Sequence, residues 1–308
     1  MSFLVELDRN TYPPHALDDF KTTPQFSLPN ARAMMWLSQL AYETAHRTKV
    51  ESIVESWGLT MHAFVSNDPA TGLPPHSACV VVAGGHGATF VTFAGSDPGK
   101  FNDWVTDFDA VPSPDDVHTG FQKAVATVWP AIETAIRNRP ASEQALFLTG
   151  HSLGGALAVL AAARSAQELK IDPTVVYTFG SPRTGGPALF QSYGLGDSTF
   201  RFVNGTDIVP TVPPAQLGDY RHVGHAIQCK TGGRFDDPET RNIAPEDNKP
   251  DFLESVAQSG LANIEALAGL QPFQGLGPGL LKQLAGVVPR LVPDHLPGDY
   301  FRALSITV

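Results

Sequence analysis

The chain has 308 residues, of which 42% are hydrophobic and 17% charged, a composition typical of a soluble globular domain with a sizeable core. Its formal net charge of -10 disfavours binding to the phosphate backbone of nucleic acids. The sequence contains no run of about 18 or more apolar residues, so no transmembrane helix is expected.

The amino-terminal third begins with irregular chain. Residues 1–29 contain several prolines and are predicted to wrap the surface, and Asn30 is the expected N-cap of a helix over 32–47. The first ten residues lack a basic segment followed by an apolar core, which favours a cytoplasmic location and leaves signal-independent export open. Two valine-rich runs, 79–83 and 89–94, flank a glycine-rich turn and predict a hairpin of buried strands.

The remainder of the chain alternates between strand and helix patterns. Helices are expected over 121–137 and 153–169, and strands over 145–148, 174–179, 199–203 and, as the last strand, 222–230. This alternation predicts a single α/β domain over 1–308, with a mostly parallel central sheet and helices on both faces. Charged residues 232–251 predict an exposed loop, and residues 251–292 predict one or two further helices.

Two cysteines, Cys79 and Cys229, each lie within a predicted strand. Buried reduced thiols are the favoured interpretation, although their spacing leaves a disulfide open.

The most informative segment is TGHSLGGAL at 149–157, between a predicted strand and a predicted helix. Gly150 and Gly154 flank Ser152 in the G-x-S-x-G pattern of a nucleophile elbow. Glycine avoids clashes in so tight a turn, which strains the serine and is expected to expose its hydroxyl at a helix N-terminus. The alternative is a glycine-rich turn that carries a solvated serine.

A serine nucleophile needs a general base, and the base needs an orienting acid; in this fold the order is Ser, acid, His. Asp207 follows the end of a predicted strand, whereas Asp172 and Asp197 precede strands and belong to the opposite sheet edge. Asp207 is therefore the favoured acid. A residue of an Asx-turn is the alternative interpretation.

Three histidines follow Asp207. His222 and His225 lie at the start of a predicted strand, where histidine is more often structural, and His295 lies in a loop bounded by proline and glycine. Loops present catalytic side chains, so the pattern favours His295 over His222. The backbone N–H groups of Leu153 and Ser96 are the candidate oxyanion donors, because one follows the nucleophile and the other follows an earlier strand.

Ordered blocks of sequence extend across roughly residues 90–302. They are FAGS at 93–96, NDWVTD at 102–107, VHTGF at 117–121, GHSLGGALA at 150–158, TFGSPR at 178–183, NGTDIVP at 204–210 and the His295 segment. Together they resemble the class 3 lipases, the fungal-type triacylglycerol lipase family with an α/β-hydrolase fold. The resemblance implies Ser152 as nucleophile, Asp207 as acid and His295 as base, with Ser96 and Leu153 as oxyanion donors.

The resemblance also shows where this chain departs from the family pattern. In the family an aromatic pair follows the catalytic histidine closely, but here Tyr300 and Phe301 follow an insertion, Pro297-Gly298-Asp299. The segment from Asp207 to His295 is also longer than usual, because it contains residues 251–292. The segment around His222 resembles a structural one.

The resemblance marks residues 97–108 as a lid. Phe101, Trp104, Val105 and Phe108 have the i, i+3, i+4, i+7 spacing of one apolar helix face. A lid would cover the site in water and turn toward lipid at an interface. A fixed amphipathic helix on the core is the alternative.

The function implied by the resemblance is carboxylic ester hydrolysis through an acyl-enzyme, with acylglycerols as substrates and transient contact with a lipid–water interface. Short soluble esters, phospholipids and aromatic acid esters are alternative substrates; a non-catalytic binding protein, a serine peptidase or an acyltransferase are alternative functions. No cofactor, metal or obligate protein partner is expected. The acidic residues within 236–247 lack the spacing of a calcium loop.

Overall fold

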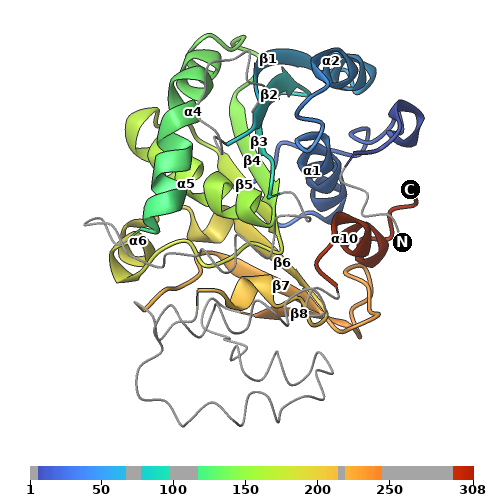
Figure 1. Cartoon of the computed structure of the whole chain (residues 1–308), viewed down its shortest axis with the longest axis vertical. Coiled ribbons are helices and arrows are strands. Elements are labelled where there is room, and N and C mark those ends of the chain that lie inside the picture. The colour runs from blue at the N-terminus through green and yellow to red at the C-terminus, as the bar shows by residue number, and fades with distance from the viewer. Residues whose placement is uncertain (1–5, 67–77, 97–116, 214–218, 245–293) are drawn as a thin grey trace.

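The computed structural model describes residues 6–66, 78–96, 117–213, 219–244 and 294–308. Within these residues one sheet contains eight strands in the order β1 to β8 (Figure 1). The strands are β1 (Thr60–Val65), β2 (Val80–Gly85), β3 (Ala88–Phe93), β4 (Ala145–His151), β5 (Thr174–Phe179), β6 (Thr199–Asn204), β7 (His225–Cys229) and β8 (Arg241–Ala244).

The centre of the sheet is parallel. Strands β3 to β7 pair in parallel, whereas β1, β2 and β3 pair antiparallel, as do β7 and β8. The predicted α/β fold with a mostly parallel sheet is therefore confirmed, and β2 and β3 form the predicted hairpin.

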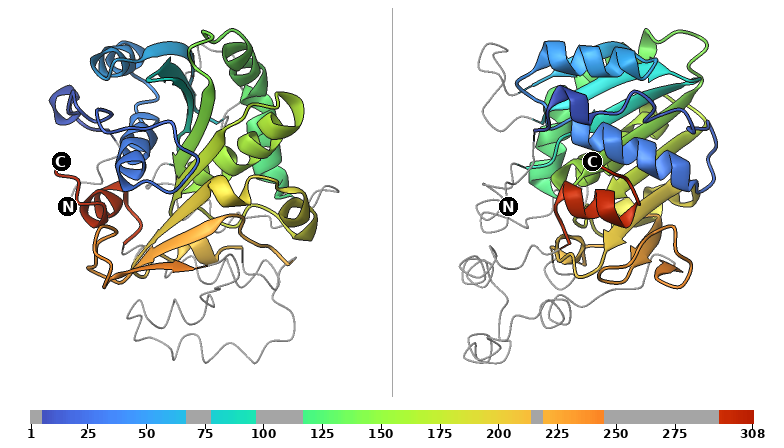
Figure 2. Two further views of the ribbon diagram at one scale, coloured as in Figure 1. Left: turned by 180° about the vertical axis from the view of Figure 1, so that it is seen from behind. Right: turned by 90° about the vertical axis from the view of Figure 1, so that its right-hand side faces the viewer.

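Helices cover both faces of the sheet (Figures 1 and 2). One face carries α1 (Leu28–Leu40), α2 (Arg47–Ser56) and α10 (Pro297–Ala303), and the other carries α4 (Thr119–Arg137), α5 (Leu153–Glu168) and α6 (Pro187–Ser192). Short 3-10 helices occupy Arg9–Thr11, Gly196–Ser198 and Val209–Thr211. Side chains alternate between the faces of a strand, so Phe147 of β4 joins the core under α1 while Leu146 and Leu148 join the core under α5.

Helix α1 begins earlier than the sequence predicts. Its N-cap is Ser27, whose hydroxyl accepts the N–H of Asn30 at 3.3 Å, and Pro29 fits the first turn because its missing N–H is not needed there. Asn30, the expected N-cap, instead bonds the backbone of Lys21 through both amide atoms. The expected single helix over 32–47 ends at Leu40, and α2 is separate from it.

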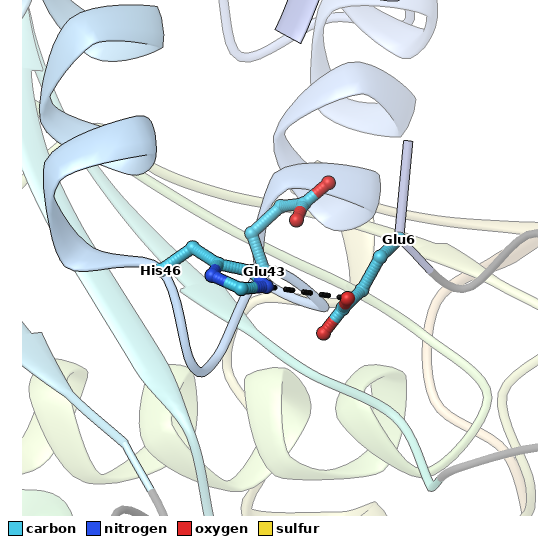
Figure 3. Close-up of side chains that lie close together, drawn as sticks. All are labelled: Glu6, Glu43 and His46. Carbon is cyan, nitrogen blue, oxygen red and sulfur yellow. Dashed lines mark hydrogen bonds and ion pairs between the residues drawn. The ribbon is translucent and has the colours of Figure 1, made fainter. Parts of the chain in front are cut away.

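The buried Glu43 fastens the amino-terminal chain between α1 and α2. Its carboxylate accepts hydrogen bonds from the Leu7 N–H at 2.9 Å and the Tyr12 hydroxyl at 2.7 Å, and the Lys49 ammonium lies 2.7 Å away. Burial and the Glu43 charge raise the pKa of Tyr12, which keeps its hydroxyl a donor. Figure 3 shows Glu43 beside the contact between His46 and Glu6, and a Glu43 carboxylate oxygen lies within 4.8 Å of a ring nitrogen of His46 and of a carboxylate oxygen of Glu6. The negative charge of Glu43 is thus compensated within the protein by the Lys49 ammonium and by two hydrogen bonds.

Two segments predicted as loops contain regular structure. Strand β8 lies in the segment predicted as an exposed loop, where it pairs antiparallel with β7, and Phe235 of the same segment is fully buried. The strand expected over 222–230 is shorter in the structure, where it is β7. It is not the last strand, because β8 pairs with its outer edge. Helix α10 occupies the expected loop after His295.

The remaining predictions concern the lid, the helices at 251–292, the cysteines and a membrane-spanning helix. The predicted lid at 97–108 and helices at 251–292 lie outside the described residues. Cys79 and Cys229 are buried, and no disulfide joins them. No described helix has the length and apolar character needed to cross a bilayer.

Candidate active site

Ser152 occupies the turn between β4 and α5, with φ of 56° and ψ of −131°. Such a backbone conformation is strained for a residue with a side chain. A Cβ on Gly150 would lie 2.2 Å from the backbone carbon of Gly154, and a Cβ on Gly154 would lie 2.4 Å from the Phe93 carbonyl oxygen. These glycines therefore allow three backbone segments to meet at the turn, which is the predicted strand–turn–helix geometry.

The Ser152 side chain is buried, although the sequence predicted an exposed hydroxyl. The residue is 2% exposed, and its hydroxyl oxygen lies 3.0 Å from Nε2 of His295. The imidazole ring thus covers part of the surface that an isolated elbow would present to solvent.

Asp207 lies in the turn after β6, where its N–H bonds the Asn204 carbonyl at 2.9 Å. Its Oδ1 accepts the N–H of Val209 at 2.9 Å, and its Oδ2 accepts the hydroxyl of Tyr300 at 2.6 Å. Both carboxylate oxygens lie 2.9 Å from Nδ1 of His295. Burial and the negative charge of Asp207 raise the pKa of Tyr300 well above its usual value, so this hydroxyl remains a hydrogen-bond donor.

His295 lies between Asp207 and Ser152 and is 3% exposed. Because Nδ1 faces a carboxylate, this nitrogen carries the proton, which leaves the Nε2 lone pair directed toward the Ser152 hydroxyl. The structure therefore brings together the three residues that the sequence singled out, although 88 positions separate Asp207 from His295.

Asp294, which sequence reasoning missed, fastens the His295 loop to the Asp207 loop. Its Oδ2 accepts the N–H of Thr206 at 2.9 Å and the Thr206 hydroxyl at 3.1 Å, and its carbonyl accepts the side-chain amide of Asn204 at 3.0 Å. The adjacency of Asp294 to His295 was the only sequence signal. The two loops are thereby held together independently of the His295 ring.

Tyr300 was noted in the sequence only for its displaced position. The inserted Pro297-Gly298-Asp299 forms the first turn of α10, with Pro297 in the opening turn where its ring is tolerated. This turn brings the Tyr300 hydroxyl back to Asp207 despite the insertion.

The competing histidines lie elsewhere. Nε2 of His222 donates to the Pro210 carbonyl at 2.6 Å, and burial, with the nearby guanidinium groups of Arg201 and Arg183, holds the pKa of His222 well below its ordinary value. The described hydrogen bond of His222 thus goes to Pro210, whereas His295 is the histidine that contacts the Ser152 hydroxyl. His225 lies 3.8 Å from Asp197.

The candidate oxyanion donors lie on either side of the elbow. Leu153 is the first residue of α5, directly after Ser152. Phe93 of β3 is paired with Gly150 of β4, so the chain after Phe93 continues beside the elbow. The approach is close, because a Cβ on Gly95 would lie 2.7 Å from the His151 carbonyl oxygen. Ser96 follows directly. The apolar residues Phe101, Trp104, Val105 and Phe108 lie outside the described residues.

Comparison with known proteins finds a family model that is similar to part of this site. Residues 90–217, which include the end of β3, the elbow and Asp207, match the family model described as Lipase (class 3). Over these residues the chain is similar to the class 3 lipases. The predicted resemblance is thus confirmed, and His295 lies beyond the residues that the family model matches.

Two curated relatives of this chain are named secreted mono- and diacylglycerol lipases. The protein from Malassezia globosa is 39% identical over 109 residues, or 33% of this chain and 35% of its own length. The protein from Fusarium solani is 37% identical over 185 residues, or 56% of this chain and 53% of its own length. The chain thus spans about one third and one half of these relatives.

The comparison corrects one sequence-based expectation. The cytoplasmic location is wrong, because the relatives from Malassezia globosa and Fusarium solani are secreted. The expectation rested only on the first ten residues, in which the pattern of a secretory signal was not recognised.

The fold is also shared with a solved triacylglycerol lipase whose catalytic centre is formed by a serine protease triad. The TM-score is 0.56 at 22% identity, with 82% of this chain and 96% of the other covered. This likeness establishes the common fold.

Proposed function

We propose that this protein is a serine carboxylic ester hydrolase that cleaves acylglycerols through an acyl-enzyme intermediate. The observation that carries the proposal is the continuous series of contacts from Asp207 through His295 to Ser152, at 2.9 and 3.0 Å. The family match and the mono- and diacylglycerol lipases among the relatives support the choice of substrate.

In the proposed first step, Oγ of Ser152 attacks the ester carbonyl carbon while Nε2 of His295 takes the hydroxyl proton. Asp207 stabilises the imidazolium that forms. The tetrahedral oxyanion accepts hydrogen bonds from the N–H groups of Leu153 and Ser96, at the positive end of α5.

Collapse of this intermediate breaks the bond to the glycerol oxygen, which takes the proton from His295 and leaves as an alcohol. Water then attacks the acyl-enzyme with His295 as the base. A second tetrahedral intermediate collapses to a free fatty acid, and the proton returns to Ser152.

The experiment that tests this function compares mono-, di- and trioleoylglycerol with phosphatidylcholine and methyl ferulate, and measures acid release by titration at constant pH. We expect acid release from the acylglycerols and none above the blank from a Ser152→Ala variant. Release from the phospholipid or the ferulate alone would replace the acylglycerol assignment by that substrate class. A lack of release from every ester would favour a non-catalytic binding protein.

The proposed lid at 97–108 adds an expectation about lipid surfaces. An apolar lid face that turns toward lipid makes the rate on tributyrin rise steeply once the substrate exceeds its solubility. A plain saturation curve through that concentration would favour a fixed amphipathic helix instead.

A further inference from the structure

Two buried side chains link the chain just after helix α1 to the backbone of the proposed base. The Tyr42 hydroxyl lies 2.7 Å from Nδ1 of His151, and Nε2 of His151 lies 2.6 Å from the carbonyl oxygen of His295. Tyr42 is 4% and His151 2% exposed. Neither residue belongs to the proposed triad, yet His151 is bonded directly to Ser152 in the chain.

Both hydrogen bonds have a defined direction. A carbonyl oxygen only accepts, so Nε2 of His151 must carry a proton and donate it to His295. Burial, and the charge of a protonated His295 nearby, keep the pKa of His151 well below its usual value, so the ring carries one proton only. Nδ1 is consequently unprotonated and accepts from the Tyr42 hydroxyl.

We propose that Tyr42 and His151 are positioning residues that hold the backbone of His295 at the place where its ring bridges Asp207 and Ser152. This inference rests on the proposed hydrolase function. His151 provides the backbone that enters the elbow and the side chain that holds the base, so one residue fixes the distance between nucleophile and base. The rings of His151 and His295 also pack, with centroids 4.7 Å apart.

The same pair contacts the strand end that leads to Ser96. A Cβ on Gly95 would lie 2.2 Å from the Tyr42 hydroxyl oxygen and 2.7 Å from the His151 carbonyl oxygen. Gly95 thus lets the chain before Ser96 pass directly against both residues. Tyr42 and His151 therefore connect the base loop, the elbow and the segment of the proposed oxyanion donor.

The test separates hydrogen bonding from packing by two substitutions of His151. His151→Gln keeps an amide N–H that can reach the His295 carbonyl, whereas His151→Leu fills a comparable space with no donor. Displacement of a catalytic group by about 1 Å costs about 10²-fold, so we expect kcat on p-nitrophenyl butyrate to fall about 10²-fold in the Leu variant with KM little changed. The Gln variant should recover most of that loss.

Tyr42→Phe provides a second comparison, matched by Tyr193→Phe. The Tyr193 hydroxyl is also buried and bonds Thr199 at 2.8 Å, but it lies at the start of β6, away from the elbow. Loss of the Tyr42 hydroxyl removes the hydrogen bond to Nδ1 of His151 and holds that ring less firmly, so kcat should fall by about 10-fold in Tyr42→Phe. Tyr193→Phe should keep the kcat of the wild type. Thermal midpoints identify variants that fail to fold.

Ser152→Ala in the same assay separates this inference from the proposed function. A wild-type chain without activity, or an active Ser152→Ala variant, would remove the function and the inference together. Serine-dependent activity with equal kcat losses in the Gln and Leu variants would show packing alone and overturn the inference. A folded His151→Leu variant with wild-type kcat would do the same. If His151→Leu does not fold, equal kcat values for Tyr42→Phe and Tyr193→Phe would contradict the proposal.

Discussion

His295→Ala is expected to lower kcat on a p-nitrophenyl ester by about 10⁶-fold, because a serine hydroxyl without a base is a weak nucleophile. His295 is the histidine whose Nε2 contacts the Ser152 hydroxyl, at 3.0 Å, and its Nδ1 is held by Asp207. Removal of the imidazole also takes one hydrogen-bond partner from the buried Asp207 carboxylate, so the thermal midpoint must be measured beside kcat.

The matched variant is His222→Ala. His222 supports the loop after Asp207 through the Pro210 carbonyl, so its loss should lower stability by about 1–3 kcal/mol and kcat by less than about 10-fold. A selective loss of kcat in the His222 variant, with a fully active His295 variant, would reverse the assignment of the base.

Gly150→Ala is expected to destabilise the fold by about 3 kcal/mol or more, because the new Cβ meets backbone that cannot rotate away. The added carbon would lie 2.2 Å from the Gly154 backbone carbon and 2.3 Å from the Gly154 carbonyl oxygen. Relief of this clash requires β4 and α5 to separate at Ser152, so hydrolysis should be lost together with stability.

Gly194→Ala serves as its control, because a Cβ at Gly194 meets no atom within 4 Å. Its free energy of unfolding should change by less than about 1 kcal/mol. Urea unfolding measures both variants. Equal free energies of unfolding for the two variants would show that the elbow tolerates a side chain, against the close contacts described above.

The elbow was predictable because its determinants are local. A short apolar run, glycines two positions before and after Ser152, and an apolar helical run lie within one segment, and β4 and α5 follow this pattern closely. Asp207 was accessible for a similar reason, since it follows the end of a recognisable strand in a parallel sheet.

His295 was harder to choose from residues alone, because its contacts depend on chain far away in sequence. The loop signal favoured it over His222, but the contact with Asp207 spans 88 positions. The roles of Asp294, Tyr42 and His151 were missed for the same reason, because each depends on hydrogen bonds to residues far away in sequence. No period or local motif encodes such contacts.

Elements at the edges of the fold were also missed. Strand β8 is a short edge strand among charged residues, and its backbone pairing with β7 outweighs its weak side-chain pattern. In α10, Pro297 and Gly298 suggested a loop, although proline is tolerated in a first helical turn. Helix α1 shows the reverse error, because Asn30 had the right chemistry for an N-cap but Ser27 fills that position.

In the proposed mechanism, Ser152 attacks the acyl carbonyl with His295 as its base. The most direct measurement is incubation with a p-nitrophenyl alkylphosphonate, followed by mass spectrometry of the intact chain and its peptides. We expect one phosphonyl group per chain, located on Ser152, with loss of hydrolysis in proportion to labelling and no adduct in Ser152→Ala. An enzyme that hydrolyses esters while Ser152 remains unlabelled, or that is labelled equally in the Ser152→Ala variant, would contradict it.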